Sequence, residues 1–427
     1  MITNSFFKSI TNFFNDVNQK KSLSYVTIRG FSVVSNYVFS ILVIYIFSKE
    51  DYGVFVYGLS VFMILSTLLK AGIDVHFVKL FYKFKEEGVP GWIKRLETKV
   101  IFSSIIITLF IAVIVYTFNL ADDATNAITL FVLSAPVYVV VHLNSAKLRS
   151  ISCINKFAFL NIAGRIALSL GFVFILYYVF LFKTSFIIYI AHFLSVVFLL
   201  LLSYLWTRNK FSYNKNQSKS IPQSFKSYNK ALMMKSYITV LFLWGDRFLL
   251  SLVCTLDQLA EYDISLKIAM LVMVVIEALK SSYAPVFARN IKDHISLEKH
   301  IKKSTKVGVL FSFLVLITLI LFGKNVLGLF GPEFIASYPL VIIISCGYFF
   351  SAIFGQADNV VEMCGLAKNY INSYFIIITL SLFTGVILSF NLGPIGMAIS
   401  FSIGNIMFQA IASQIVYKKL GLKTRLF

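Results

Sequence analysis

Long apolar stretches, separated by short polar segments, recur along the whole chain and limit the folds that it can adopt. Hydrophobic residues make up 58% of the 427 residues, whereas charged residues make up 14%. A membrane-spanning helix needs about 20 predominantly apolar residues. About twelve stretches meet this criterion, which predicts an all-α polytopic membrane protein. The stretches are residues 24–47, 54–78, 100–118, 127–146, 157–179, 186–206, 236–255, 264–287, 307–322, 338–356, 370–390 and 395–417.

The basic residues fall on alternate connecting segments. Lys and Arg gather in residues 79–99, 207–235 and 288–306 and near the C-terminal end, while the segments between them are short and mostly acidic. Because basic loops stay on the cytoplasmic side, this pattern places both termini in the cytoplasm. The net charge of +20 is therefore explained by topology and by attraction to anionic lipid headgroups, and no nucleic-acid partner is expected.

The longest polar segment divides the apolar stretches into two sets of six. We expect an N-terminal lobe at residues 24–206, a cytoplasmic linker at 207–235 and a C-terminal lobe at 236–417, followed by a basic cytoplasmic tail at 418–427. Phenylalanines recur at helical spacing within residues 1–23. This pattern predicts an amphipathic segment on the inner membrane surface, with a frayed terminus as the alternative.

Composition argues against catalysis and metal binding. The four cysteines are scattered without a CxxC pair, and the five histidines form no HExxH motif. The segments assigned to the outside are too short to fold as a domain with a hydrolytic site. We therefore expect no catalytic residue, no metal and no cofactor.

The two halves of the chain resemble each other. When Tyr52 is aligned with Tyr262, Lys70 falls opposite Lys280 without a gap. Transporters are often built from two related halves with the binding site between them. The alignment therefore predicts a pseudo-symmetric pair of lysines at equal depth.

Six cations lie inside stretches that otherwise suit lipid. A cation in hydrocarbon costs roughly 2.5–3.5 kcal/mol on insertion scales, so several retained cations indicate a use. The natural use is to hold an anion in a cavity between helices. The six residues are Arg29, Lys70, Arg165, Arg247, Lys267 and Lys280.

Arg247 has the deepest position of the six. It lies about eleven residues into its stretch, or about 16 Å at 1.5 Å per residue, and is expected to face the substrate, with a structural ion pair as the alternative. Asp246 points about 100° away around the helix, so we expect no direct pairing with Arg247. Asp246 either pairs with another helix or takes part in proton or cation coupling.

The other cations have closer alternatives. Lys70 has Asp74 four residues later, and Lys280 has Glu277 three residues earlier, so a local ion pair competes with substrate binding in each. Arg29 lies close enough to the end of its stretch to reach the interface, Arg165 lies deeper, and Lys267 is expected at the interface. The candidate substrate-binding residues are Arg247, Lys70, Lys280, Arg29 and Arg165, and the candidates for coupling or ion pairing are Asp246, Asp74 and Glu277.

Several short motifs in order resemble one transporter family. They are FSKEDYGVF at 47–55, WGDRFLLS at 244–251, EYDISLKIAM at 261–270, YAPVFAR at 283–289, LGLFGPEF at 327–334 and NLGPIGMAIS at 391–400. Together they resemble the polysaccharide repeat-unit (O-antigen, Wzx-type) flippases of the MATE/MOP transporter superfamily. One departure is Ala260, which stands before Glu261 and Tyr262 where the family usually has glycine.

The resemblance implies a V-shaped bundle of two six-helix lobes related by a pseudo-two-fold axis, with a cationic central cavity. It implies flipping of an undecaprenyl-diphosphate-linked oligosaccharide to the periplasmic face of the bacterial inner membrane by alternating access. Inner membrane lipids, a glycan polymerase and chain-length proteins are the implied partners. Coupling to a proton or sodium gradient stays open.

Two other functions compete with this one. A cation-coupled multidrug exporter of the same fold would need carboxylates in its cavity, but residues 24–47 contain none. A membrane glycan polymerase or ligase usually carries a large outside loop, which this chain lacks. The flippase is therefore the leading hypothesis.

Overall fold

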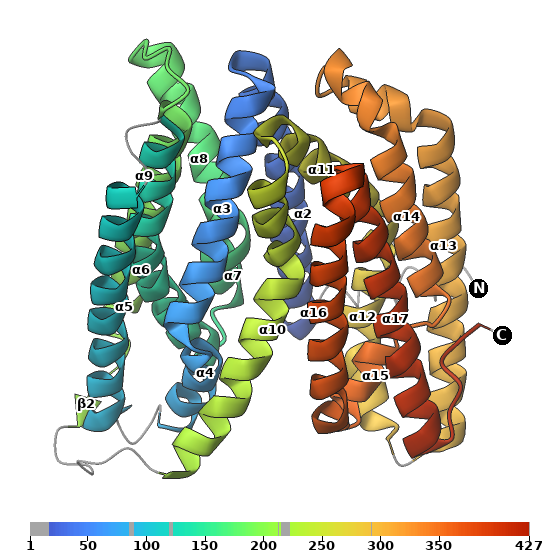
Figure 1. Cartoon of the computed structure of the whole chain (residues 1–427). Helices are drawn as coiled ribbons and strands as arrows, with labels where there is room; N and C mark the ends of the chain where they lie inside the picture. The colour runs from blue at the N-terminus through green and yellow to red at the C-terminus, as the bar shows by residue number, and fades with distance from the viewer. Residues whose placement is uncertain are drawn as a thin grey trace, which may run out of the picture. The chain divides into compact units, whose positions relative to one another are not determined.

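The computed structural model describes residues 17–84, 89–118, 123–211, 213–214, 223–291 and 293–426. Nearly all of these residues are helical (Figure 1). Within them, eleven helices are long and apolar enough to cross a membrane, which confirms the predicted all-α polytopic class. Of the amphipathic segment predicted at residues 1–23, residues 1–16 lie outside the described part, and Val17 already begins the first described helix.

The first half of the chain contains ten α-helical or π-helical segments and two very short strands in its described part. Both η segments here are single π-helical turns within the fifth predicted span. The elements are α2 (Val17–Ile46), α3 (Lys49–Lys70), α4 (Ile73–Lys83), β1 (Val89–Pro90), α5 (Gly91–Phe118), α6 (Asp123–Ser150), α7 (Ile154–Ala158), η1 (Phe159–Ala163), α8 (Gly164–Phe174), η2 (Ile175–Val179), α9 (Ile187–Thr207) and β2 (Tyr213–Asn214).

The described part of the second half contains helices and no strand, and one of its helices is a short 3₁₀ turn, η3. Its first helix begins within the polar linker predicted at residues 207–235, so the helix extends well beyond the apolar stretch. The elements are α10 (Gln223–Val253), α11 (Leu256–Ala269), α12 (Leu271–Arg289), α13 (His294–Gly328), η3 (Pro332–Ser337), α14 (Tyr338–Ala352), α15 (Ala357–Met363), α16 (Ala367–Leu392) and α17 (Pro394–Leu420).

Two predicted spans are broken rather than continuous. The stretch 54–78 ends as α3 at Lys70 and resumes as α4 at Ile73, because Ala71 and Gly72 adopt positive φ angles of 48° and 69°. The stretch 264–287 is divided between α11 and α12 at Met270 and is not among the eleven candidate spans. Hydropathy averages over such interruptions and therefore does not reveal them.

The chain forms two compact units that are not two continuous pieces of sequence. The first unit takes the described residues up to Phe47 and those of Val61–Tyr237, and the second takes Ser48–Ser60 and Ile238–Phe427. Composition had assigned the whole of 24–206 to one lobe, whereas the packing places the first part of α3 with the second unit. The two units are described separately below.

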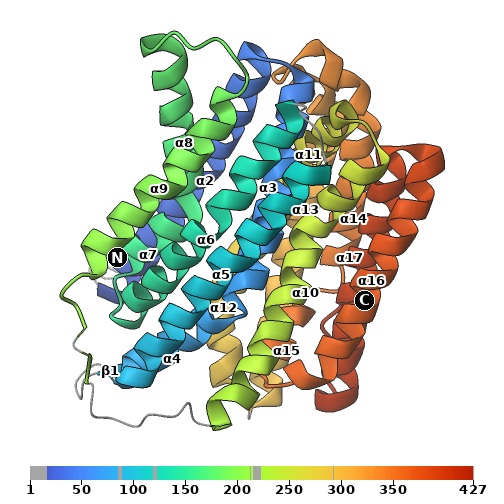
Figure 2. The ribbon, with the colours of Figure 1, turned by 60° about the vertical axis from the view of Figure 1, so that its left-hand side comes forward.

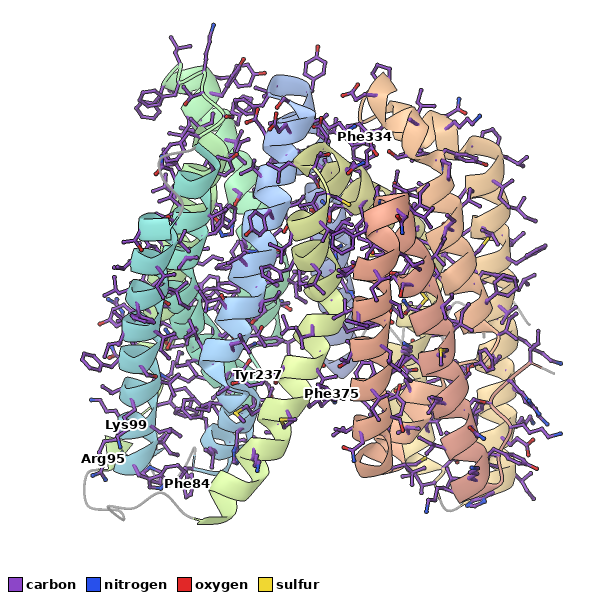
Figure 3. The ribbon with its side chains drawn as sticks, in the orientation of Figure 1. Phe84, Arg95, Lys99, Tyr237, Phe334 and Phe375 are labelled. Carbon is purple, nitrogen blue, oxygen red and sulfur yellow. The ribbon has the colours of Figure 1, made fainter. Side chains whose placement is uncertain are left out.

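In the first unit, α6 packs against α4, α5 and α9 (Figures 1 and 2). Helix α4 directs Ile73, Phe77 and Phe81, which are four residues apart, into one buried cluster. Arg95 and Lys99 lie at the same end of this unit as Phe84, the residue that ends α4 (Figure 3). Strands β1 and β2 pair in parallel at this end and join the chain before α5 to the chain after α9.

In the second unit, α17 lies between α14 and α16 (Figure 1). After α17 ends, the chain continues as an extended tail in which Leu422 and Thr424 are buried and the alternate residues are exposed. The hydroxyl of Thr305 donates to the carbonyl of Thr424 (3.0 Å), and the amide of Leu426 donates to the carbonyl of Ile353 (2.9 Å). The end of the predicted basic tail is therefore packed onto the second unit.

Candidate functional site

Arg247 of α10 is buried and bound to carboxylates. Its Nε donates to Oδ1 of Asp263 at 2.6 Å, and its Nη1 donates to the carbonyl of Leu243 at 2.8 Å. The guanidinium also lies over the ring of Trp244, 4.8 Å from its centroid. Because Asp263 follows on α11, this ion pair joins two helices of the second unit.

Asp246 shares in the same group of contacts. Its Oδ1 accepts the backbone N–H of Arg247 at 2.8 Å and lies 3.4 Å from the Nη1 of that side chain. Its Oδ2 accepts the hydroxyl of Tyr262 at 2.8 Å. The prediction that Asp246 and Arg247 do not pair directly was wrong, because the long arginine side chain folds back along its own helix and brings the guanidinium within reach.

Asp263 connects this group to α3. Its Oδ2 accepts the hydroxyl of Tyr52 at 2.7 Å and forms an ion pair of 3.0 Å with Lys267, whose ammonium also contacts the Tyr52 hydroxyl. Lys267 is therefore an ion-pair residue of this group, a role that its predicted place at the interface did not indicate. We call the six residues the Arg247 network: Tyr52, Asp246, Arg247, Tyr262, Asp263 and Lys267.

The Arg247 network is neutral as a whole, since two carboxylates balance two cations. Breaking a buried pair by removing one partner costs about 3–5 kcal/mol, because an uncompensated charge is left behind. The arrangement therefore fastens the first part of α3 and α10 onto α11.

Two further contacts fasten the same part of α3. A Cβ on Gly53 would lie 2.1 Å from the carbonyl oxygen of Leu256, so only glycine allows the two backbones to approach this closely. Lys49 pairs with Glu261 and lies 5.4 Å from the ring centroid of Phe334, near one end of the second unit (Figure 3). The Tyr-Gly motif that follows the first span thus serves docking on α11.

Lys70 and Asp74 form an ion pair across the break in the second predicted span. The Nζ of Lys70 is 2.9 Å from Oδ2 of Asp74, and each side chain is 14% exposed. Lys70 is the last residue of α3 and Asp74 lies in the first turn of α4, so both charges complement the helix dipoles. The sequence had placed Lys70 well inside a continuous helix, but the helix ends at this residue.

The break itself is held by α10. A Cβ on Gly72 would lie 2.8 Å from the backbone of Leu232 and Met233, and the hydroxyl of Tyr237 donates to the carbonyl of Leu68 at 3.0 Å (Figure 3). These residues all belong to the first unit. His142 of α6 lies within electrostatic reach of the ion pair, so α6 passes near it as well.

Lys280 of α12 has two carboxylate partners. Its Nζ is 2.8 Å from Oδ2 of Asp358 and 3.2 Å from Oε1 of Glu277, and its side chain is 17% exposed. The amide of Asn359 donates to the backbone carbonyl of Lys280 at 3.1 Å, which holds α15 against α12. The local pairing with Glu277 was foreseen from spacing, whereas Asp358 carried no sequence signal.

Arg165 and Arg29 lie in different surroundings of the first unit. Arg165 follows the π-helical turn η1, lies 5.9 Å from the ring centroid of Phe62 and interacts with the hydroxyl of Tyr138. Its Nη1 is buried and finds no hydrogen-bond partner in the described part of the chain. Arg29 is exposed on α2.

The described residues contain no group of three or more His, Cys, Asp or Glu side chains placed to hold a metal ion. The structure instead sorts the eight candidate residues by partner. It brings together Lys70 with Asp74, Lys280 with Glu277, and Arg247 with Asp246. The structure adds four residues that contact these candidates: Tyr52, Tyr262, Asp263 and Asp358. The alignment of the two halves had pointed to the two tyrosines, but no sequence argument had pointed to the two aspartates.

A family model described as "Polysaccharide biosynthesis protein" matches residues 19–291, which is more than half of the chain. None of the curated proteins compared with the chain matches it in sequence.

Solved structures with a similar fold include a multidrug resistance MATE family transporter of the MOP superfamily in an inward-facing conformation. It has 14% identity and a TM-score of 0.67, over 91% of this chain and 96% of that one. A MOP superfamily transporter from Pyrococcus furiosus, in which a reverse polarity of the binding pocket suggests a different function, has 15% identity and a TM-score of 0.65, over 93% and 95%. The lipid II flippase MurJ in an inward closed conformation has 14% identity and a TM-score of 0.69, over 93% and 87%. At these identities the similarity shows the fold, which is that of MATE/MOP transporters.

Proposed function

Because the chain belongs to the polysaccharide biosynthesis protein family, we propose that it flips an undecaprenyl-diphosphate-linked oligosaccharide from the cytoplasmic to the periplasmic face of the bacterial inner membrane. The observation that carries the proposal is the family match over residues 19–291 in a multi-pass membrane protein. The MurJ structure of the same fold is a lipid II flippase, which supports a lipid-linked substrate. The protein acts as a transporter, not as an enzyme.

The chemistry of such a substrate explains why cations are retained. A lipid diphosphate keeps its tail in the bilayer, but its anionic head loses hydration as it crosses, and protein cations replace that hydration. Lys70 and Lys280 suit this role, since each retains some exposure and each lies at a matched position of the internal repeat. Arg165 and Arg29 are further candidates in the first unit.

Arg247 is proposed to act indirectly. Its guanidinium already binds Asp263, Asp246 and a backbone carbonyl, so few donors remain for a phosphate. Its role is then to hold the network that fastens α3 to α11. This interpretation replaces the substrate-facing role that its depth suggested.

Alternating access, with both termini in the cytoplasm, is part of the proposal. A glycan polymerase and chain-length proteins are the expected partners on the periplasmic side. Coupling to a proton or sodium gradient is compatible with the buried carboxylates.

The test measures surface glycan in a bacterial cell that lacks its own repeat-unit flippase. We expect the chain to restore surface glycan, and Lys70→Gln combined with Lys280→Gln to abolish the restoration. Lys299→Gln is the matched control, because Lys299 is an exposed lysine on α13. Membrane levels of each variant are compared so that a lost signal is not lost protein.

Absence of glycan restoration by the unmodified chain, across donor strains with different repeat units, contradicts the proposed function. Export of cationic dyes by the same cells, without any effect on glycan, favours the multidrug exporter instead.

A further inference from the structure

Each of the two repeat-matched lysines is already neutralised in this structure. Lys70 carries one positive charge and is paired with Asp74, so the pair is neutral. Lys280 carries one positive charge and is paired with Asp358 and Glu277, so this group is negative overall. An approaching phosphate therefore meets no net positive charge at either lysine unless the carboxylates withdraw.

The aspartates of these pairs are only partly satisfied. Oδ1 of Asp74 and Oδ1 of Asp358 are buried and have no hydrogen-bond partner within the described residues. A buried carboxylate that served only structure would be expected to have both oxygens hydrogen-bonded, as Asp246 and Asp263 do. The lysine is thus the main partner that each aspartate possesses.

Both aspartates lie on short helices that follow a left-handed glycine. Asp74 is in the first turn of α4, after Gly72 with φ 69°, and Asp358 is in the first turn of α15, after Gly355 with φ 72°. In each unit, therefore, the lysine and the aspartate lie on different helices, and a non-helical glycine precedes the helix that carries the aspartate. Asn359 keeps the backbone of α15 on α12, so separation at Lys280 requires a movement of the Asp358 side chain rather than of the helix.

We infer that Asp74 and Asp358 are built-in competitors of the substrate diphosphate. Each aspartate leaves its lysine when a phosphate binds there, and it returns to the lysine to expel the phosphate after crossing. The inference rests on the proposed function and adds the residues that keep binding weak enough for release. A transporter with unopposed lysines would hold its anion too tightly to turn over.

The test uses farnesyl diphosphate as a short-chain probe and the full-length protein in detergent. Asp74→Asn, and Asp358→Asn combined with Glu277→Gln, keep the side-chain volumes and leave Lys70 or Lys280 without a paired carboxylate. Each protein is therefore expected to bind the probe about tenfold more tightly or better. The same variants are expected to restore less surface glycan than the unmodified chain. Glu298→Gln is the matched control, because Glu298 pairs with Lys302 on the surface of α13, and it is expected to change neither quantity.

A second comparison separates competition for the lysine from simple repulsion. Adding Asp74→Asn to a Lys70→Gln protein is expected to give no gain in affinity, because the aspartate then has no lysine to compete for. An equal gain in that background overturns the inference. Unchanged, weaker or undetectable binding in the Asp74→Asn protein or in the Asp358→Asn, Glu277→Gln protein overturns it as well. The proposed function is judged separately, by glycan restoration with the unmodified chain.

Discussion

The Arg247 network and the Lys70–Asp74 pair both place cations within apolar surroundings, yet their partners differ in number. Every carboxylate oxygen of Asp246 and Asp263 has a donor, and Arg247 has an ion pair, a carbonyl and an aromatic ring. Asp74 has a bare oxygen, and Lys70 has one hydrogen-bonded carboxylate. A cation in a span is therefore not by itself a substrate contact. We expect a cation whose carboxylate partners are fully hydrogen-bonded to hold helices together, and one whose partner has an unbonded oxygen to be able to exchange that partner for a ligand.

The largest expected effect is that of Arg247→Ala. Removing the arginine leaves two buried carboxylates short of a partner, so we expect a loss of stability of about 3–5 kcal/mol. The measurement is the thermal unfolding of purified protein in detergent, together with the yield of monodisperse protein.

Asp263→Asn sharpens this prediction, because it attacks the same ion pair from the other side. A structural pair predicts losses of similar size in both variants. The contrary outcome is an Arg247→Ala protein that is stable but does not restore glycan, together with an Asp263→Asn protein that is fully active. This outcome would show that Arg247 contacts the substrate.

Tyr52→Phe removes one hydroxyl from the Arg247 network. Hydrogen bonds to charged groups contribute about 1.5–3 kcal/mol, and the Tyr52 hydroxyl binds Asp263 and contacts Lys267, so we expect a loss in this range. Thermal unfolding in detergent measures it. Tyr45→Phe is the control, since Tyr45 is 90% exposed, and an equal effect of the two changes would argue against the network.

Gly53→Ala tests whether the docking of α3 depends on close backbone contact. The added methyl group meets the carbonyl of Leu256, and overpacking of this kind costs about 1–3 kcal/mol. Gly171→Ala in α8 is the control, because a Cβ there meets nothing within 4 Å, and helix propensity predicts a small gain instead. Equal melting temperatures for the two variants would contradict the docking.

The smallest stability effect is expected for Lys70→Gln. The pair with Asp74 joins residues four apart and each side chain keeps 14% exposure, so water reaches the charge that is left behind. Its loss is therefore expected to cost less than the loss of Arg247. Surface glycan is nevertheless expected to fall, which is the reverse of what a fastening residue would show. A large loss of thermal stability in Lys70→Gln would place this lysine in the same class as Arg247.

The sequence alone was sufficient for the class of fold, since apolar length and the side of the basic segments determine where helices cross a bilayer. It was insufficient for the breaks at Gly72 and Met270, because an average over twenty-odd residues does not register one or two left-handed or irregular positions. Helix α15 was missed for the same reason, since its seven residues are too few to form a span.

The candidate site was predictable where partners are close in sequence. Glu277 and Asp74 lie three and four residues from their lysines, so helical spacing identified both pairs, although the helix is broken between Lys70 and Asp74. Asp358 is 78 residues from Lys280, and Asp263 is 16 residues from Arg247, so only the packing of different helices brings these pairs together. Depth along a span likewise gave no indication of Asp263, the carboxylate that Arg247 and Lys267 share.

The packed tail after α17 has a practical consequence for how this protein is handled. Gly355 lies beneath the tail, where an added Cβ would be 2.3 Å from the Thr305 hydroxyl and 2.6 Å from the Thr424 carbonyl, and the chain then enters α15. An affinity tag or a fluorescent fusion at the C-terminal end that pulls this segment away would loosen the turn that presents Asp358. Hydrogen exchange at the Leu426 amide offers a direct readout of that disturbance, at a position remote in sequence from every candidate substrate contact.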